Sequence, residues 1–273
     1  MTELSSEFFR RGDVRLHYVQ AGTGTTVLLI HGIPDYWNSW RHQISHFSRS
    51  HRVVAVDLRG VNRSDQPEGV VAYRIVELVR DTVALIDHLG LERVSIVGHD
   101  LGAIIAWWTA ILAPRRVERL AVLSAPHPAC YAKAKEQGDV YHYPEFLAQV
   151  AAAAPGASFD ADLMSKWGAD PEVRSELVEA LRRSSVEGLR NFYRANNDEV
   201  ANTQLTKLAP VSAPVLALYG TEDRLVPATA YAESAAHVGG AFRLVAIPGV
   251  GHYPHQQAAA RVNSDIERWL NDR

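Results

Sequence analysis

An aspartate occupies the sharpest turn that the sequence predicts. Residues 98–102 are Gly-His-Asp-Leu-Gly, between the apolar run Val94–Val97 and a helical pattern that begins at Gly102. A tight strand-to-helix turn requires small residues two positions before and after its apex, because side chains there would collide with the neighbouring backbone. A helix-capping role would explain Asp100 alone but not the flanking glycines. The pattern predicts that Asp100 is a nucleophile.

A carboxylate nucleophile restricts the electrophile. A serine that attacked an sp³ carbon would leave an ether that water does not readily remove, whereas a carboxylate forms an ester that water cleaves at the carbonyl carbon. The sequence contains no Gly-x-Ser-x-Gly motif that could supply a serine instead. We therefore expect a substrate that reacts at an sp³ carbon, as epoxides and alkyl halides do.

A second motif follows another apolar run. Thr26–Ile30 leads into His31-Gly32-Ile33-Pro34. Together with the aspartate turn, this His-Gly-x-Pro sequence resembles the epoxide hydrolases and related dehalogenases of the α/β-hydrolase superfamily. Residues 57–65, Asp-Leu-Arg-Gly-Val-Asn-Arg-Ser-Asp, also resemble a loop of that family, with Asn62 where glycine is usual. The resemblance covers nearly the whole predicted core.

The resemblance implies the partners of the nucleophile. The acid that orients the base would be Asp223, three residues after the glycine that ends a strand, with the neighbouring Glu222 as the alternative. His252, which follows a glycine-rich loop, would be the base that activates water. The backbone N–H groups of Ile33 and Leu101 would form the oxyanion hole.

Epoxide opening creates an alkoxide, and the resemblance implies two cap tyrosines that protonate it. The segment Glu187–Asn196 resembles the one that carries the second tyrosine, here Tyr193. The segment Tyr143-Pro144-Glu145-Phe146-Leu147 resembles the one that carries the first, which would be Tyr143. Tyr141 is an alternative for this first position.

Departure of a halide needs different groups. Haloalkane dehalogenases have a tryptophan directly after the nucleophile, and haloacetate dehalogenases have arginines one and four positions after it. Leu101 and Ile104 stand at these positions here. They favour a neutral, fairly apolar epoxide, with water as the second substrate. The alternatives are a haloalkane or haloacetate dehalogenase, an enzyme that opens an epoxide within a natural product, and a non-catalytic ligand-binding protein of the same fold.

The elements that must position these residues alternate between strands and helices, as in a parallel sheet covered on both faces. The predicted strands are Val14–Ala21, Thr26–Ile30, Arg52–Leu58, Val94–Val97, Leu120–Leu123, Val215–Tyr219 and Phe242–Ile247. The predicted helices are Ile75–Leu89, Gly102–Leu112, Phe146–Ala154, Pro171–Ser184, Val186–Ala195 and Gln256–Asn271. With the resemblance, they predict an α/β-hydrolase fold with a mostly parallel eight-stranded sheet.

The middle of the chain differs from its two ends. Residues 127–208 contain helical patterns but no strand pattern. We therefore predict a core formed by residues 1–126 and 209–273 and a helical cap formed by residues 127–208, which is inserted after the sixth strand.

Composition excludes other classes of function. The chain has 273 residues, of which 22% are charged, and its net charge is -3, which gives no electrostatic reason to expect nucleic acid or a membrane surface. No signal-peptide pattern is present, so we expect a cytoplasmic protein, and a homodimer is compatible with the sequence.

Cys130 is the only cysteine, which excludes an internal disulfide and argues against a cysteine-built metal site. His42-Gln43-Ile44-Ser45-His46 lacks the glutamate of a zinc protease motif. We expect neither a cofactor nor a metal.

Overall fold

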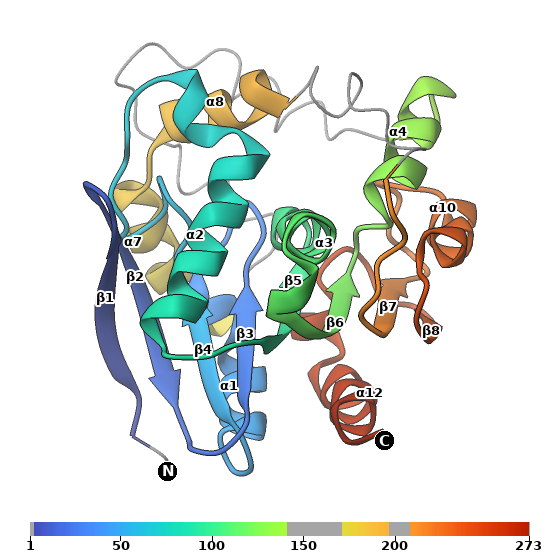
Figure 1. Ribbon diagram of the computed structural model, residues 1–273, viewed down its shortest axis with the longest axis horizontal. Coiled ribbons are helices and arrows are strands. Elements are labelled where there is room, and N and C mark those ends of the chain that lie inside the picture. Colours follow the sequence, from blue (N-terminus) through green and yellow to red (C-terminus); the bar gives the residue numbers. More distant parts are fainter. Residues whose placement is uncertain (1–2, 141–170, 197–207, 273) are drawn as a thin grey trace.

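A single eight-stranded sheet organises the chain. The computed structural model describes residues 3–140, 171–196 and 208–272. The strand order is β1-β2-β4-β3-β5-β6-β7-β8 (Figure 1). The strands are β1 Ser5–Arg11, β2 Val14–Ala21, β3 Thr26–Ile30, β4 Arg52–Val56, β5 Val94–His99, β6 Val117–Leu123, β7 Val215–Gly220 and β8 Phe242–Ile247. Strands β3 to β8 run parallel to one another, so the predicted mostly parallel sheet is confirmed.

The first strand was not predicted from the sequence. β1 pairs with β2 in an antiparallel hairpin at the edge of the sheet, and β2 pairs antiparallel with β4. The sequence of β1, Ser-Ser-Glu-Phe-Phe-Arg-Arg, has two adjacent aromatic residues instead of an alternating or continuous apolar pattern. Only Phe9 of this strand is buried, because an edge hairpin needs few apolar residues.

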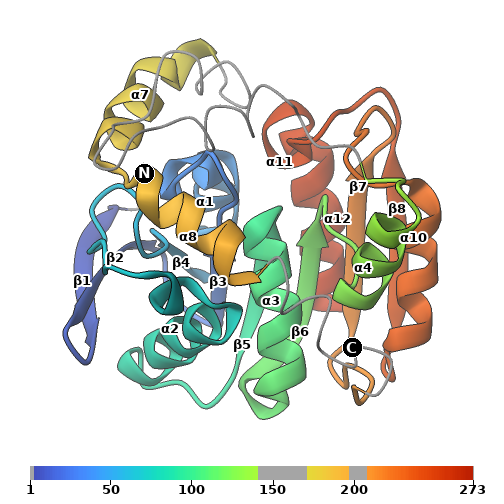
Figure 2. The same ribbon diagram turned by 90° about the horizontal axis from the view of Figure 1, so that it is seen from above.

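Helices cover both faces of the sheet (Figures 1 and 2). Helices α2 and α3 contribute to one buried apolar cluster, and α1 and α12 contribute to another on the opposite face. The helices are α1 Arg41–Phe47, α2 Ile75–His88, α3 Leu101–Leu112, α4 Pro128–Glu136, α7 Arg174–Arg183, α8 Val186–Asn196, α10 Ala228–Glu233, α11 Pro254–Gln257 and α12 Ala259–Asn271. The short helices α1, α4 and α10 were not predicted, because fewer than three turns give a weak periodic signal.

Two predicted helices have different bounds in the structure. The predicted helix Pro171–Ser184 is a 3-10 turn, Pro171–Val173, followed by α7. The predicted C-terminal helix is divided into α11 and α12 by Ala258, whose φ of -133° and ψ of 43° are not helical. The predicted helix Phe146–Ala154 lies outside the described residues.

The described part of the predicted cap lies between β6 and β7 in the chain. It consists of α4, a 3-10 turn, α7 and α8, and none of its described residues forms a strand. Helix α8 lies beside α2 and the 3-10 turn η2, Val70–Tyr73, above the carboxyl ends of the strands (Figures 1 and 2). This arrangement agrees with a helical insertion, and the exact domain boundaries remain a prediction.

Candidate active site

Asp100 occupies a strained turn between β5 and α3. Its φ is 51°, a left-handed conformation that costs a non-glycine residue about 1–3 kcal/mol and that is concentrated at functional sites. The Asp100 N–H donates to the Leu123 carbonyl oxygen at 3.0 Å. A Cβ atom on Gly98 would collide with the Gly102 carbonyl, and one on Gly102 would collide with the Ile30 carbonyl. The glycines on both sides of the nucleophile are therefore required by backbone contacts.

Substitution of Gly98 tests this steric requirement. We expect Gly98→Ala to lower the free energy of unfolding by about 3 kcal/mol, because the obstructing atoms belong to the backbone of a buried helix and cannot rotate away. Gly239→Ala is the matched control, since its Cβ would meet nothing closer than 3.5 Å. Urea unfolding measures both values. Equal effects of the two substitutions would show that the turn tolerates a side chain.

A hydrogen-bonded chain joins the three predicted catalytic residues. His252 Nδ1 lies 2.8 Å from Asp223 Oδ2, and His252 Nε2 lies 3.3 Å from Asp100 Oδ2. The Asp223 side chain is fully buried and that of His252 is 6% exposed, whereas that of Asp100 remains 26% exposed. Glu222 is exposed, so the structure places Asp223, and not its neighbour, beside the histidine.

One of the two predicted oxyanion-hole donors contacts the same carboxylate. The Ile33 N–H donates to Asp100 Oδ1 at 2.9 Å. Leu101 is the first residue of α3, so its N–H is not needed within the helix. Gly32 makes this approach possible, because a Cβ there would lie 2.5 Å from the Asp100 Cβ. His31 has a structural role, since its Nε2 accepts the Leu58 N–H at 3.1 Å.

The ionisation of Asp100 and His252 is coupled. Burial opposes the charge on Asp100, but the hydrogen bond and charge of His252 outweigh it and lower the pKa to about 2. Burial also opposes the charge on His252, but hydrogen bonds to Asp100 and Asp223 raise its pKa to about 9. The resting pair at neutral pH is therefore a carboxylate and an imidazolium.

This coupling predicts how stability depends on pH. The pKa of His252 rises from 6.5 to about 9 on folding, so its stabilising contribution is complete below pH 6.5 and is lost as the pH rises through about 9. We expect the difference in unfolding free energy between the parent and His252→Gln to shrink by roughly 3 kcal/mol between pH 6 and pH 9.5. Chemical denaturation at the two pH values measures it. A difference that does not change with pH would contradict the raised pKa.

Tyr193 is on α8, close enough to Asp100 for the charge of that carboxylate to act on its hydroxyl. Burial, together with the negative charge of Asp100 and the nearby Tyr131, raises its pKa far above the ordinary value, so the hydroxyl keeps its proton at neutral pH. A proton donor to an alkoxide needs this state. Tyr143 and the alternative Tyr141 lie outside the described residues.

Tyr131, on α4, was not predicted to be a site residue. Burial and the charge of Asp100 raise its pKa to about 12, which places it in the same electrostatic environment as Tyr193. Its position in the first helix after β6 was the only available signal, because no motif surrounds it.

Two buried histidines lie behind the catalytic one. His99 Nε2 lies 2.7 Å from the carbonyl oxygen of His252, and the ring centroid of His255 lies 4.3 Å from that of His99. Burial lowers the pKa of His99 to about 4 and that of His255 well below its ordinary value, so both rings are neutral at pH 7. They support the loop that carries His252 without adding charge beside it.

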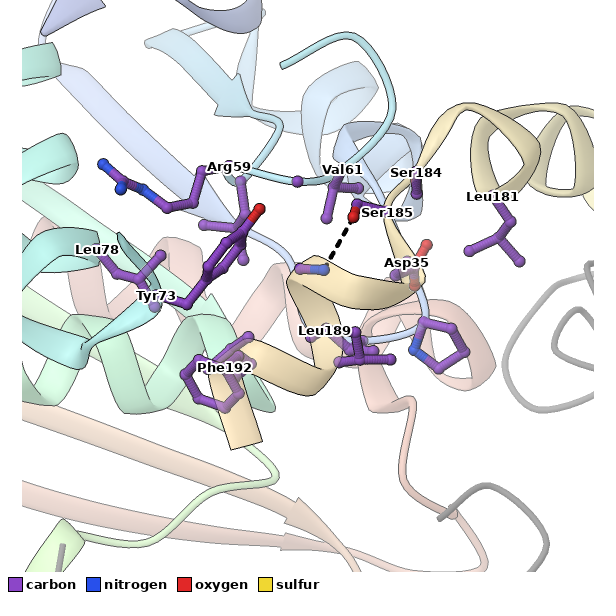
Figure 3. Close-up of a pocket in the computed structure, with 16 residues that line it drawn as sticks. Asp35, Arg59, Val61, Tyr73, Leu78, Leu181, Ser184, Ser185, Leu189 and Phe192 are labelled. Atoms are coloured by element: carbon purple, nitrogen blue, oxygen red, sulfur yellow. Dashed lines mark hydrogen bonds between the residues drawn. The ribbon is translucent and has the colours of Figure 1, made fainter. Parts of the chain in front are cut away.

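An apolar pocket adjoins the nucleophile. Ile33, whose N–H donates to Asp100, and Leu101, which follows Asp100 in the chain, form part of its wall. Figure 3 shows that the lining continues between the core and α8, where Tyr73, Leu189 and Phe192 face it. Such a lining suits an uncharged organic molecule.

One group of potential metal ligands occurs within the described residues. Ligand atoms of His127, Cys130 and His237 lie within 4.8 Å of one another. The two imidazole rings are stacked, with centroids 4.3 Å apart and planes 2° apart. The nitrogen lone pairs of two parallel rings lie in two parallel planes that do not meet, so they do not converge on one ion. The Ala129 N–H also donates to His127 Nδ1 at 3.2 Å. This arrangement does not form a metal site without rotation of the rings.

Comparisons with known proteins find relatives and solved structures that are named epoxide hydrolases. Epoxide hydrolase 2 of Caenorhabditis elegans is 29% identical over 300 residues, covering 97% of this chain and 80% of that protein. The crystal structure of an epoxide hydrolase from Vigna radiata has a TM-score of 0.85 and 26% identity and covers 98% of both chains. That of Bacillus megaterium epoxide hydrolase with an inhibitor has a TM-score of 0.86 and 26% identity, over 97% of this chain and all 100% of the other. No helix among the described residues is long and apolar enough to cross a membrane. The family described as alpha/beta hydrolase fold matches residues 25–259, and the chain belongs to this family.

Proposed function

We propose that this protein is an epoxide hydrolase that converts a neutral, apolar epoxide into a vicinal diol. The observation that carries the proposal is the carboxylate at the strand-to-helix turn, 3.3 Å from an imidazole that is itself held by a buried carboxylate at 2.8 Å. An aspartate nucleophile suits an sp³ carbon, because the resulting ester can be hydrolysed. The epoxide hydrolases among its relatives support the same activity.

The first half-reaction forms an ester. An Asp100 carboxylate oxygen attacks one epoxide carbon, and the bond between that carbon and the epoxide oxygen breaks. The epoxide oxygen takes the proton of the Tyr193 hydroxyl, and Tyr143 is proposed as the second donor. The products are an alkyl ester on Asp100 and a tyrosinate. The high pKa of Tyr193 keeps the donor protonated until the alkoxide develops.

The second half-reaction depends on the change in charge at Asp100. Ester formation removes one of the two carboxylates that raise the pKa of His252, so the imidazolium can release the proton that restores the tyrosine. Neutral His252 then takes a proton from water, and the hydroxide attacks the ester carbonyl. The N–H groups of Ile33 and Leu101 stabilise the oxyanion. Cleavage releases the diol, and the resting carboxylate and imidazolium return.

A paired assay tests the activity. The purified protein is incubated separately with styrene-oxide-like epoxides, haloalkanes and haloacetates, and diol and halide are measured. We expect diol from epoxides and no halide, because Leu101 and Ile104 supply neither a halide-binding tryptophan nor a carboxylate-binding arginine. Halide without diol would replace the proposal with a dehalogenase, and neither product would favour a ligand-binding protein. An enzyme that acts on a larger natural-product epoxide would use the same chemistry.

A further inference from the structure

The ring of Tyr73 lies tightly between two glycines of different segments. The side chain is 2% exposed. A Cβ on Gly60, in the loop after β4, would lie 3.1 Å from the ring. A Cβ on Gly188, in the first turn of α8, would lie 2.7 Å from the Tyr73 hydroxyl oxygen and 2.9 Å from the ring carbon that bears it. Figure 3 shows the ring beside the N-terminal turn of α8.

Gly188 is better explained by this contact than by the helix itself. Glycine is a poor residue for a helix, because it loses more backbone freedom than alanine does. No positive φ requires it, since Gly188 is absent from the positive-φ residues among those described. Its N–H donates to the Ser185 hydroxyl oxygen at 2.9 Å, and any residue other than proline could make this bond because the donor is the backbone. The close approach of Tyr73 is what excludes a side chain.

A second contact fixes the other end of α8 to the same turn. Asn196 Nδ2 donates to the Tyr73 carbonyl oxygen at 2.9 Å, and Asn196 Oδ1 accepts the Ile75 N–H at 2.7 Å. Tyr193 lies between Gly188 and Asn196 along the helix. Both ends of the segment that carries Tyr193 are therefore held against η2 and the start of α2.

We propose that Tyr73 is a positioning residue, and that its ring, in contact with Gly188, sets how closely α8 approaches the core and thereby where the Tyr193 hydroxyl lies over Asp100. The Tyr73 hydroxyl is buried without a hydrogen-bond partner among the described residues, so the contact depends on the shape of the side chain. The inference rests on the proposed epoxide hydrolase function. According to the inference, the Tyr73–Gly188 contact affects the rate of the step in which Tyr193 donates its proton.

Gly188→Ala tests the inference, because the new methyl group must push α8 away from Tyr73. Ester formation and ester hydrolysis are followed separately in single-turnover quench experiments, by the mass of the peptide that contains Asp100. We expect ester formation to slow by roughly 10- to 100-fold, the scale of a misplacement of about 1 Å. Ester hydrolysis, which uses Asp223 and His252, should stay within about twofold. Gly239→Ala is the matched control, since it is unobstructed and remote from the pocket.

Two double variants separate positioning from a general loss of structure. In the Tyr193→Phe background, Gly188→Ala should slow ester formation no further, because the residue through which it acts is already disabled. Tyr73→Phe with Gly188→Ala should recover part of the rate, since it removes the atom closest to the new methyl group. Equal slowing of both steps, or an undiminished effect without the Tyr193 hydroxyl, would overturn the inference alone. A parent protein that hydrolyses no epoxide would overturn the proposed function, and the inference with it.

Discussion

His252→Gln is expected to stop the reaction after ester formation and to leave one epoxide attached to Asp100. Glutamine cannot take a proton from water, so hydrolysis of the ester should fall by about 10³- to 10⁴-fold, as for loss of a catalytic base of this kind. Ester formation needs the carboxylate and the tyrosine and should continue. Mass spectrometry of the peptide that contains Asp100 should show an increase equal to the mass of the epoxide.

The same experiment has two useful comparisons. His46→Gln is a matched control, because His46 lies near the surface with its Nε2 3.4 Å from a glutamate of α12. It should retain turnover and accumulate no ester. Asp100→Ala should lose both the modification and turnover, because no carboxylate remains at the turn. Repeated turnover by Asp100→Ala would refute the nucleophile assignment.

Tyr193→Phe is expected to slow ester formation by about 10²- to 10⁴-fold, the usual contribution of a positioned general acid. Without the hydroxyl, the epoxide oxygen would leave as an unprotonated alkoxide in an apolar pocket, where charge is costly. The double variant Tyr143→Phe with Tyr193→Phe should abolish epoxide opening. Single-turnover measurement of ester formation provides the readout.

Tyr219→Phe is the matched control for the tyrosine variants. Its ring stacks on Tyr231 with centroids 4.6 Å apart, on the side of β7 near α10. The control should keep the parent rate of ester formation. Unchanged epoxide turnover in the Tyr143 and Tyr193 double variant would mean that neither of these two tyrosines is the acid that opens the epoxide.

Short sequence patterns were enough to predict much of the core. The buried parallel strands are short, nearly continuous apolar runs, as strands that are covered on both faces usually are. The glycines around Asp100 indicate a turn, because the backbone constraint acts within five consecutive residues. β1 was missed because an edge strand buries little, and the division at Ala258 was missed because the helical pattern continues across it.

Tertiary contacts decided between the residues that the sequence left as alternatives for one role. Asp223 and Glu222 are adjacent carboxylates, and the sequence alone left both open as the partner of His252. The structure buries one beside the imidazole and exposes the other, because the loop after β7 is held against the loop after β8, where the Glu222 N–H donates to the Val250 carbonyl oxygen at 2.8 Å. Tyr131 likewise lies in no local motif.

The sequence by itself determined which groups can react, their order along the chain and the class of electrophile that a carboxylate nucleophile suits. Only the tertiary structure decided which of them meet, as Asp100, Asp223 and His252 do at the carboxyl ends of parallel strands. It also showed that Tyr73 meets Gly188, a pair separated by more than a hundred residues in the sequence. The physical reason is that spacing along a chain constrains only the nearest turn, whereas contacts between distant segments depend on how the whole sheet and its helices pack.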